Sequence, residues 1–95
     1  MATRLADEEI SNRLAELQDW RRNGDAIERK LVFDNFDAAI AFINRIAPLA
    51  DAADHHPEIF NVYNRVELTL STHDAGGLTT KDFDLASKID AVVTA

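Results

Sequence analysis

Apolar residues recur along this chain with two different periods, and these periods predict its secondary structure. Near the start, Ile10, Leu14 and Leu17 have the three- to four-residue spacing of one face of a helix. Residues 7–9 are all acidic, which favours the first turn of a helix because the helix dipole is positive at that end. We therefore expect a first helix here. Its cap is either Ala6 or Asp7, and of these only Asp7 has a side chain that can accept from the free amides of the first turn.

The next segment has the features of a β-hairpin. A turn at Asn23-Gly24 lies between residues 19–22 and 26–33, and an Asn-Gly pair between two extended runs is a good hairpin signal. In the second run, apolar residues such as Ile27 and Leu31 alternate with charged ones. This alternation is typical of a strand with one buried face.

From about Asn35 the helical period returns. Asp34 or Asn35 is placed to cap this second helix, which we expect to reach about Ala53. Pro48 lies inside it, and a proline within a helix removes one backbone hydrogen bond and crowds the preceding turn. We expect a kink or a broken last turn there, or else a second short helix that starts at Pro48. The apolar positions that mark this amphipathic helix are Phe36, Ile40, Ile43, Ala47 and Ala50.

A second hairpin is predicted over residues 56–73. We take Asn64-Arg65 as the centre of its tight turn, since asparagine tolerates positive φ. With that turn, His56 faces His73 at the open end of the hairpin. The core face then carries Ile59, Tyr63, Val66, Leu68 and Leu70, and the face left for solvent or a partner carries Phe60, Val62, Glu67, Thr69 and Ser71.

A last helix is expected after the Gly76-Gly77 pair. Thr79 is followed three residues later by Asp82, which is the spacing of a capping box, so this helix begins at Thr79 or Thr80. The elements therefore follow one another as helix, hairpin, helix, hairpin and helix. This order predicts a single α+β domain over residues 1–95, a four-stranded antiparallel sheet with three helices on one face.

Composition narrows the class of protein. The chain has 95 residues, a net charge of −7, a pI near 4.7 and only ten dispersed Lys and Arg residues. This acidity argues against direct binding to nucleic acid, which needs a basic patch. The absence of cysteine excludes disulfides, thiolate nucleophiles and Cys-based zinc sites. No segment has the apolar length of a membrane span or of a signal peptide core, so we expect a cytoplasmic protein, and its small core favours self-association.

Three histidines form the main concentration of reactive groups. His55 and His56 are adjacent, and the predicted hairpin brings His73 to them. An imidazole with the usual pKa of about 6.5 is roughly one-quarter protonated at pH 7, so it serves as acid or base and contributes roughly 10²–10⁴ in rate. This constellation suits proton transfer, such as the elimination or addition of water, better than covalent catalysis. The carboxylates that flank it are those of Asp54, Asp74 and Asp82.

Other interpretations of the same residues stay open. Three histidines are the ligand set of some zinc hydratases, but neighbouring strand residues point to opposite faces. His55 and His56 can therefore coordinate the same metal ion only if the strand starts after Pro57. Taken singly, each histidine is otherwise an ordinary surface or half-buried residue. Asp82 is either an active-site carboxylate or only the capping partner of Thr79.

Several segments resemble the signature of a known family. They are DHHPE at 54–58, FNVYN at 60–64, TLSTH at 69–73, and GLT at 77–79 followed by Asp82. In this order and spacing they resemble the pterin-4a-carbinolamine dehydratases, and the resemblance extends over nearly the whole chain. The chain departs from the usual family residues at Asp51, Ile59 and Lys81, and its Pro48 is unusual.

The resemblance implies a lyase that removes water from a 4a-hydroxytetrahydropterin to give a quinonoid dihydropterin, during recycling of tetrahydropterin. It implies neither a metal nor an organic cofactor. His55 and His73 match the family's general acid/base histidines, and His56 matches the one that holds the pterin. The residues predicted as catalytic are His55, His56, His73 and Asp82. Those predicted to bind substrate are the three histidines together with Asp54, Ser71, Thr72 and Asp74.

The resemblance also implies partners. Animal members of the family are dimerisation partners of a homeodomain transcription factor, through a helical surface that otherwise makes their own tetramer. We expect a homodimer or homotetramer that binds a small pterin and makes no direct contact with nucleic acid or membrane. The alternative is a non-catalytic protein-binding module with the same fold.

Overall fold

The computed structural model describes residues 3–94, and it confirms the predicted order of elements. Three α-helices, four strands and a short 3₁₀ helix make up this part of the chain. The helices are α1 (Asp7–Leu14), α2 (Phe36–Ala53) and α3 (Thr80–Thr94). The strands are β1 (Arg21–Asn23), β2 (Ala26–Val32), β3 (Glu58–Val62) and β4 (Arg65–Leu70), and the 3₁₀ helix η1 is His73–Ala75.

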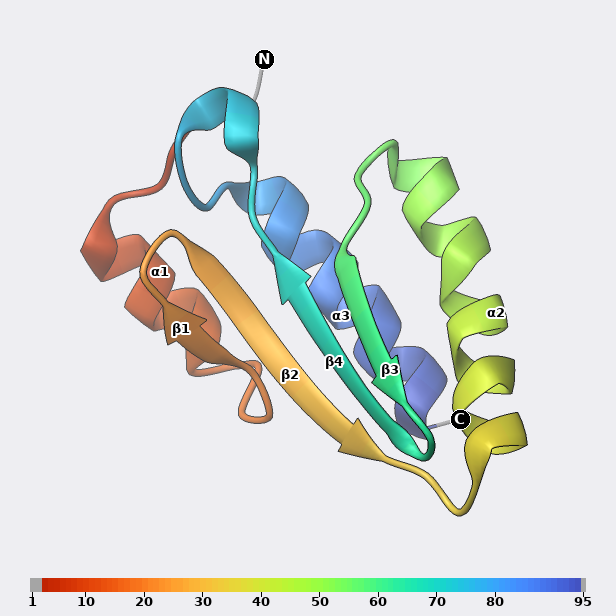
Figure 1. The fold of residues 1–95 in the computed structure, drawn as a ribbon. Helices are drawn as coiled ribbons and strands as arrows, with labels where there is room; N and C mark the ends of the chain where they lie inside the picture. Colours follow the sequence, from red (N-terminus) through yellow and green to blue (C-terminus); the bar gives the residue numbers. More distant parts are fainter. Residues whose placement is uncertain (1–2, 95) are drawn as a thin grey trace.

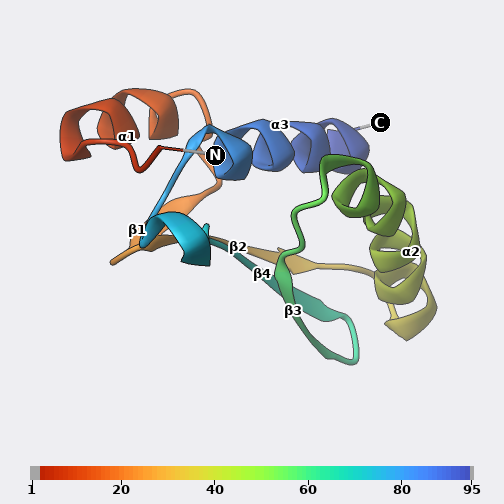
Figure 2. The same cartoon turned by 90° about the horizontal axis from the view of Figure 1, so that it is seen from above.

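The strands form one open antiparallel sheet in the order β1-β2-β4-β3, so that β1 and β3 are its edges (Figure 1). Figure 2 shows the helices on one side of the twisted sheet, with α3 between α1 and α2. The predicted α+β fold is therefore confirmed. None of the helices within residues 3–94 is long and apolar enough to cross a membrane.

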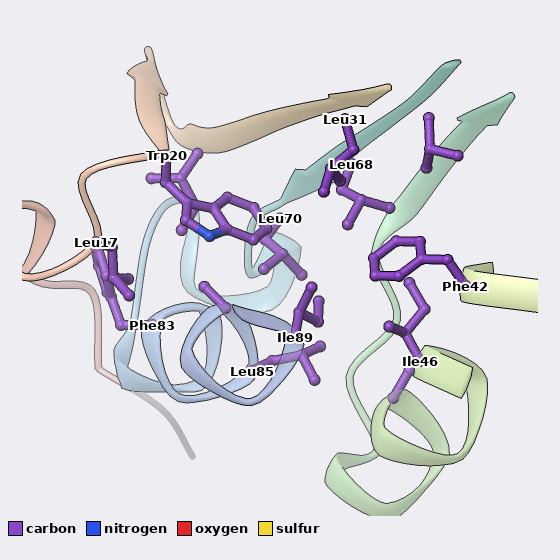
Figure 3. Packing of buried hydrophobic residues seen from close by; sticks show 14 of the residues in the cluster. Leu17, Trp20, Leu31, Phe42, Ile46, Leu68, Leu70, Phe83, Leu85 and Ile89 are labelled. Carbon is purple, nitrogen blue, oxygen red and sulfur yellow. The ribbon is translucent and has the colours of Figure 1, made fainter. Parts of the chain in front are cut away.

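The hydrophobic core lies between the sheet and the helices (Figure 3). Along β4 every second side chain is buried, because alternate residues of a strand point to opposite faces. On β2 the same face carries two buried residues, with the half-buried Arg29 between them. The buried residues of these strands are Ile27 and Leu31 on β2, and Val66, Leu68 and Leu70 on β4. The helices supply Ile10, Ala39, Phe42, Ile46, Ala50, Phe83, Leu85, Ala86 and Ile89.

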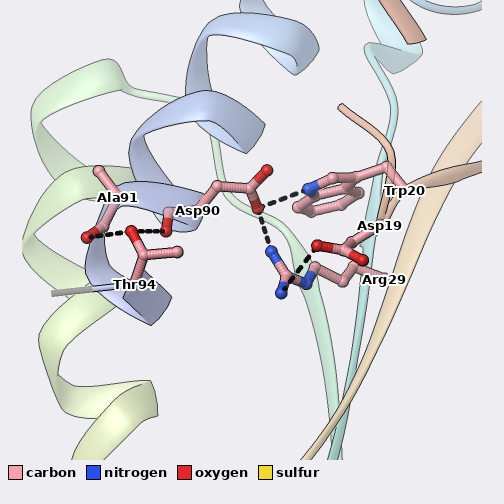
Figure 4. Close-up of polar contacts among 6 residues, drawn as sticks. All are labelled: Asp19, Trp20, Arg29, Asp90, Ala91 and Thr94. Carbon is pink, nitrogen blue, oxygen red and sulfur yellow. Dashed lines mark hydrogen bonds and ion pairs between the residues drawn. The ribbon is translucent and has the colours of Figure 1, made fainter. Parts of the chain in front are cut away.

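A polar cluster ties the first hairpin to α3 (Figure 4). The indole nitrogen of Trp20 donates a hydrogen bond to the Asp90 carboxylate at 2.8 Å, and the guanidinium of Arg29 donates to the same carboxylate. Arg29 also forms an ion pair with Asp19 at 3.5 Å. Only 10% of the Arg29 side chain is exposed, so these two carboxylates replace the hydration that its charge loses on burial.

The turns of both hairpins differ from the prediction by one residue. In the first, Asn23 pairs with Ala26, so the centre of the turn is Gly24-Asp25 and not Asn23-Gly24. Gly24 has a φ of 61°, which glycine adopts without a steric penalty. Gly24 is therefore in the turn, as predicted, but it is the first of the two central residues and not the second.

In the second hairpin, Val62 pairs with Arg65, so the centre of the turn is Tyr63-Asn64 and not Asn64-Arg65. The physical reason is a contact between Asn64 and Phe33. The Asn64 side chain donates to the Phe33 carbonyl at 3.0 Å, and the Asn64 carbonyl accepts from the Phe33 amide at 2.8 Å. Asn64 is thus held by the segment after β2, and Tyr63 takes the left-handed conformation with a φ of 49°.

This shift moves each pairing by two residues, so Ile59 faces Leu68. An even shift keeps the strand faces unchanged, and the predicted core residues of β4 are completely buried. The core positions predicted for Ile59 and Tyr63 are wrong, because the edge strand and its turn lie beyond the cover of the helices. These two side chains are 42% and 60% exposed. The predicted pairing of His56 with His73 is also wrong, since β3 begins at residue 58 and β4 ends at residue 70.

The second helix also differs in detail from the prediction. α2 continues through Pro48 to Ala53, so the expected broken last turn and the alternative second helix are both wrong, and the expected kink stays a prediction. Its cap is Asn35, whose side chain accepts from the Ala38 amide at 2.8 Å. The buried face is Ala39, Phe42, Ile46 and Ala50, so most of the predicted stripe lies on its flank. In α1, the cap position is Ala6, and Asp7 is the first helical residue.

Candidate active site

The C-terminal end of α2 directs the two adjacent histidines. Asp54 has a left-handed backbone (φ 48°, ψ 44°), and the amide of His55 donates back to the Ala50 carbonyl at 3.1 Å. This closure is a common way to end a helix, and aspartate tolerates it better than most residues. The chain turns sharply at this point. As a result, the side chain of His55 is only 10% exposed, whereas that of His56 is 60% exposed.

A small closed loop carries the third histidine. The loop is pinned at its base by two hydrogen bonds, from the Thr72 amide to the Gly77 carbonyl at 3.1 Å and from the Gly77 amide to the Thr72 carbonyl at 3.3 Å. His73 begins η1 inside this loop, and Gly76 closes it with a φ of 73°. The loop lies at the same end of the sheet as the end of α2 (Figure 1).

These two segments line a single cleft of about 350 Å³. The cleft contains the three histidines and every position predicted to bind substrate, whose roles remain predictions. The cleft is also lined by the side chain of Lys81, from the first turn of α3. The lining residues are Asp54, His55, His56, Ser71, Thr72, His73, Asp74 and Lys81.

A completely buried carboxylate, that of Asp82, lies behind His55. Its Oδ1 atom is 2.6 Å from Nε2 of His55, and its Oδ2 atom accepts from the Thr72 hydroxyl and the Thr79 amide, both at 2.9 Å. Because an ionised carboxylate only accepts hydrogen bonds, Nε2 of His55 carries a hydrogen and Nδ1 is left for a ligand. Asp82 thus accepts from the first turn of α3, as the capping interpretation predicted, and it also contacts His55. Its role as an active-site carboxylate stays a prediction.

The other two imidazoles have different surroundings. Nε2 of His56 is 2.9 Å from Oδ1 of Asp51, and both side chains are more than half exposed. His73 is exposed, and its ring has no hydrogen-bond partner among residues 3–94. The site therefore holds one shielded ring, one exposed ring beside a carboxylate, and one ring without a hydrogen-bond partner in the described part of the chain.

Thr79 also belongs to this network, although the sequence predicted it only as a helix cap and as part of the family signature, with no role in the site. It is completely buried, and its hydroxyl lies 2.8 Å from that of Thr72. The capping-box spacing of Thr79 and Asp82 was the signal that could have included it. Thr72 was predicted to bind substrate, but its hydroxyl is directed at Asp82 and Thr79 and its residue is only 8% exposed.

The zinc interpretation has no matching arrangement in the described part of the chain. Among residues 3–94, no group of three or more His, Asp or Glu side chains is placed to hold a metal ion. The two adjacent histidines direct their Nε2 atoms to separate carboxylates, those of Asp82 and Asp51.

The fold and the cleft define a class of small α+β proteins with a histidine and aspartate site at one end of an antiparallel sheet. Residues 3–92 match the family model described as pterin 4 alpha carbinolamine dehydratase. The chain belongs to this family, as its sequence signature indicated.

Two bacterial relatives, provisionally named pterin-4-alpha-carbinolamine dehydratases, match almost end to end. One, from Roseiflexus sp. (strain RS-1), is 52% identical over 93 residues, which cover 98% of this chain and 100% of the relative. The other, from Picosynechococcus sp., is 51% identical over 90 residues, which cover 95% of this chain and 98% of the relative.

Two solved structures share the fold. A crystal structure described as a transcriptional coactivator/pterin dehydratase from Brucella melitensis has a TM-score of 0.91 and 39% identity, and the match covers 95% of this chain and 98% of that one. A pterin dehydratase-like protein described as a RuBisCO assembly factor in the alpha-carboxysome has a TM-score of 0.68 and 22% identity, over 81% of this chain and 92% of that one. The second likeness shows the fold alone.

Proposed function

We propose that this protein removes water from a 4a-hydroxytetrahydropterin and releases the quinonoid dihydropterin. The observation that carries the proposal is a cleft lined by three imidazoles, one of which is held by a buried carboxylate. Hydroxide is a poor leaving group, so the reaction needs a proton donor, and a positioned imidazole supplies one near neutral pH. Membership of the family supports the choice of a pterin as substrate.

In this proposal His55 is the general acid. Asp82 accepts from Nε2 and stabilises the imidazolium form, so the ring is held ready to donate a proton from Nδ1. The carbon–oxygen bond of the carbinolamine breaks, its electron pair leaves with the oxygen, and the proton from His55 completes a water molecule.

His73 is the complementary base. The ring nitrogen next to the reacting carbon forms the new double bond and must lose its own proton. The His73 ring has no partner within residues 3–94, so it is available to accept that proton. One proton enters the substrate and one leaves, and both histidines return to their starting forms by exchange with water.

The remaining lining groups are proposed to hold the pterin. Its flat ring carries several N–H donors, and the exposed carboxylates of Asp54 and Asp74 are acceptors for them. His56 and Ser71 supply further hydrogen bonds at the rim of the cleft.

The test of this function is a spectrophotometric assay of carbinolamine dehydration by the wild-type protein. We expect a rate well above that of buffer, and the same rate after dialysis against a chelator. A rate equal to that of buffer, from protein shown to be folded by circular dichroism, would overturn the proposal and favour the non-catalytic binding module. A rate that is lost on chelation and restored by zinc would instead favour a metal-dependent hydratase.

We also propose that the chain self-associates as a homodimer or homotetramer. β3 is an edge strand, and its outer side has no partner strand among residues 3–94. It exposes three large apolar side chains, Ile59 at 42%, Phe60 at 53% and Val62 at 46%. A second copy would pair with the free backbone groups of this edge and cover these side chains.

Sedimentation at micromolar concentration is expected to give a mass that is a multiple of 10.6 kDa. Replacing Phe60 with aspartate should shift the distribution toward the monomer, because the substitution places a charge in the apolar contact. Asn23→Asp on β1 adds the same charge at the opposite edge and should leave the mass unchanged. A wild-type protein that sediments only as a 10.6 kDa species would contradict self-association.

A further inference from the structure

A chain of hydroxyl groups runs through the interior from the start of α3 to the carboxylate that holds His55. The Lys81 amide donates to the Thr79 hydroxyl at 3.3 Å, and the hydroxyls of Thr79 and Thr72 are 2.8 Å apart. The Thr72 hydroxyl donates to Oδ2 of Asp82 at 2.9 Å. Each hydroxyl has a single hydrogen, and Thr72 uses its hydrogen on Asp82, so Thr79 must donate to Thr72. All hydrogen bonds of the chain therefore point toward Asp82.

This chain satisfies one side of the carboxylate and leaves the other for the imidazole. Oδ2 of Asp82 accepts from Thr72 and from the Thr79 amide, while Oδ1 accepts from His55. Asp82 and Thr79 are completely buried, and Thr72 is 8% exposed, so water does not substitute easily for a missing donor. With both threonines in place, the carboxyl plane is fixed and Oδ1 is aimed at Nε2 of His55.

We propose that Thr72 and Thr79 are positioning residues that fix the orientation and tautomer of His55 through Asp82. The hydroxyl chain holds Oδ1 where it accepts from Nε2, so the hydrogen of the neutral ring stays on Nε2 and Nδ1 is the nitrogen presented to the cleft. Thr72, although it lines the cleft, acts on the carboxylate behind His55 and does not bind the substrate through its hydroxyl. The expected change in kcat rests on the proposed dehydratase function, whereas the expected change in the tautomer of His55 does not.

A helix cap without any link to the histidine is the competing explanation. Thr79 caps α3 in the ordinary way, and loss of a threonine cap typically costs about 1 kcal/mol of stability. The cap of α2 provides a matched control, because Asn35 accepts from the Ala38 amide at 2.8 Å and does not belong to the hydroxyl chain. Asn35 and His55 lie at opposite ends of α2, which is about 27 Å long at 1.5 Å per residue.

The test compares Thr72→Val and Thr79→Val with Thr72→Ser, Thr79→Ser and Asn35→Ala. Nitrogen-15 spectra of the histidine rings report which ring nitrogen carries the hydrogen. We expect the wild type to show His55 with hydrogen on Nε2, the valine variants to show a mixture of tautomers, and the serine variants to restore the wild-type pattern. In the dehydration assay, the valine variants should lose roughly 10- to 100-fold in kcat with little change in KM, as for outer partners of metal-bound histidines.

Two results would overturn this proposal. One is an unchanged His55 ring signal in both valine variants, which would leave the threonines as structural caps. The other is the same change of signal in Asn35→Ala, which would mean that any weakened cap disturbs the ring. The nitrogen-15 spectra are recorded without substrate. They therefore test the positioning role of Thr72 and Thr79 even if the protein does not dehydrate the carbinolamine.

Discussion

Replacement of His55 or His73 by alanine is expected to lower kcat for carbinolamine dehydration by roughly 10²- to 10⁴-fold, the usual contribution of a positioned acid or base. Each substitution removes one end of the proposed proton transfer. His55 loses the group that protonates the departing hydroxyl, and His73 loses the group that takes the proton from the ring nitrogen. Stopped-flow absorbance with saturating substrate measures the loss, and circular dichroism checks that each variant is folded.

His56→Ala is the comparison within the same cleft. The His56 side chain is 60% exposed and interacts with the still more exposed carboxylate of Asp51, so we expect its removal to raise KM more than it lowers kcat. If His55→Ala and His73→Ala both turn over at the wild-type rate, the assignment of acid and base is wrong. If only one of them does so, the remaining histidine serves both steps.

Asp82→Ala is expected to cost roughly 3–5 kcal/mol of the free energy of unfolding, a large part of the total of a small domain. The carboxylate is completely buried and accepts three hydrogen bonds, from His55, Thr72 and the Thr79 amide. Its removal leaves these donors without a partner in the interior, where each unsatisfied group costs about 1–3 kcal/mol. Equilibrium urea unfolding gives the difference directly.

Asp82→Asn separates the structural part of this effect from the chemical part. An amide of the same shape keeps acceptor capacity toward the helix cap, so most of the stability should remain. It does not stabilise an imidazolium as a carboxylate does, so kcat should fall by at least tenfold. An Asp82→Ala protein within about 1 kcal/mol of wild type would show that the buried hydrogen bonds contribute little.

The fold was largely predictable because its signals are local. The strict alternation of β4, the apolar Ile27 and Leu31 of β2, and the caps at Asn35 and Thr79 are visible in short stretches of sequence. The register of the second hairpin was not, because it depends on the contact of Asn64 with Phe33, which is 31 residues away. The buried face of α2 was also predicted incorrectly. Both the predicted stripe and the observed buried face consist of apolar residues, so the sequence alone does not distinguish them.

The sequence predicted that the three histidines lie together, but it did so from an incorrect strand register that paired His56 with His73. They line one cleft because Asp54 turns the chain at the end of α2 and because the Thr72 and Gly77 backbones close the loop that carries His73. Neither device depends on strand pairing at residues 56 and 73. The sequence offered two competing interpretations of Asp82, a helix cap or an active-site carboxylate. Only the three-dimensional arrangement shows that one carboxylate contacts both the Thr79 amide and His55, and its role in catalysis stays a prediction.

The two edges of the sheet are unequal, and this limits how far sheets join together. β1 is three residues long and polar, with two arginines, so a neighbouring copy meets like charges there. Antiparallel pairing of β3 with the same strand of another copy is isologous and uses both β3 edges completely. Growth along the sheet by this route therefore terminates at a closed pair, with no free apolar edge from which a fibre could extend.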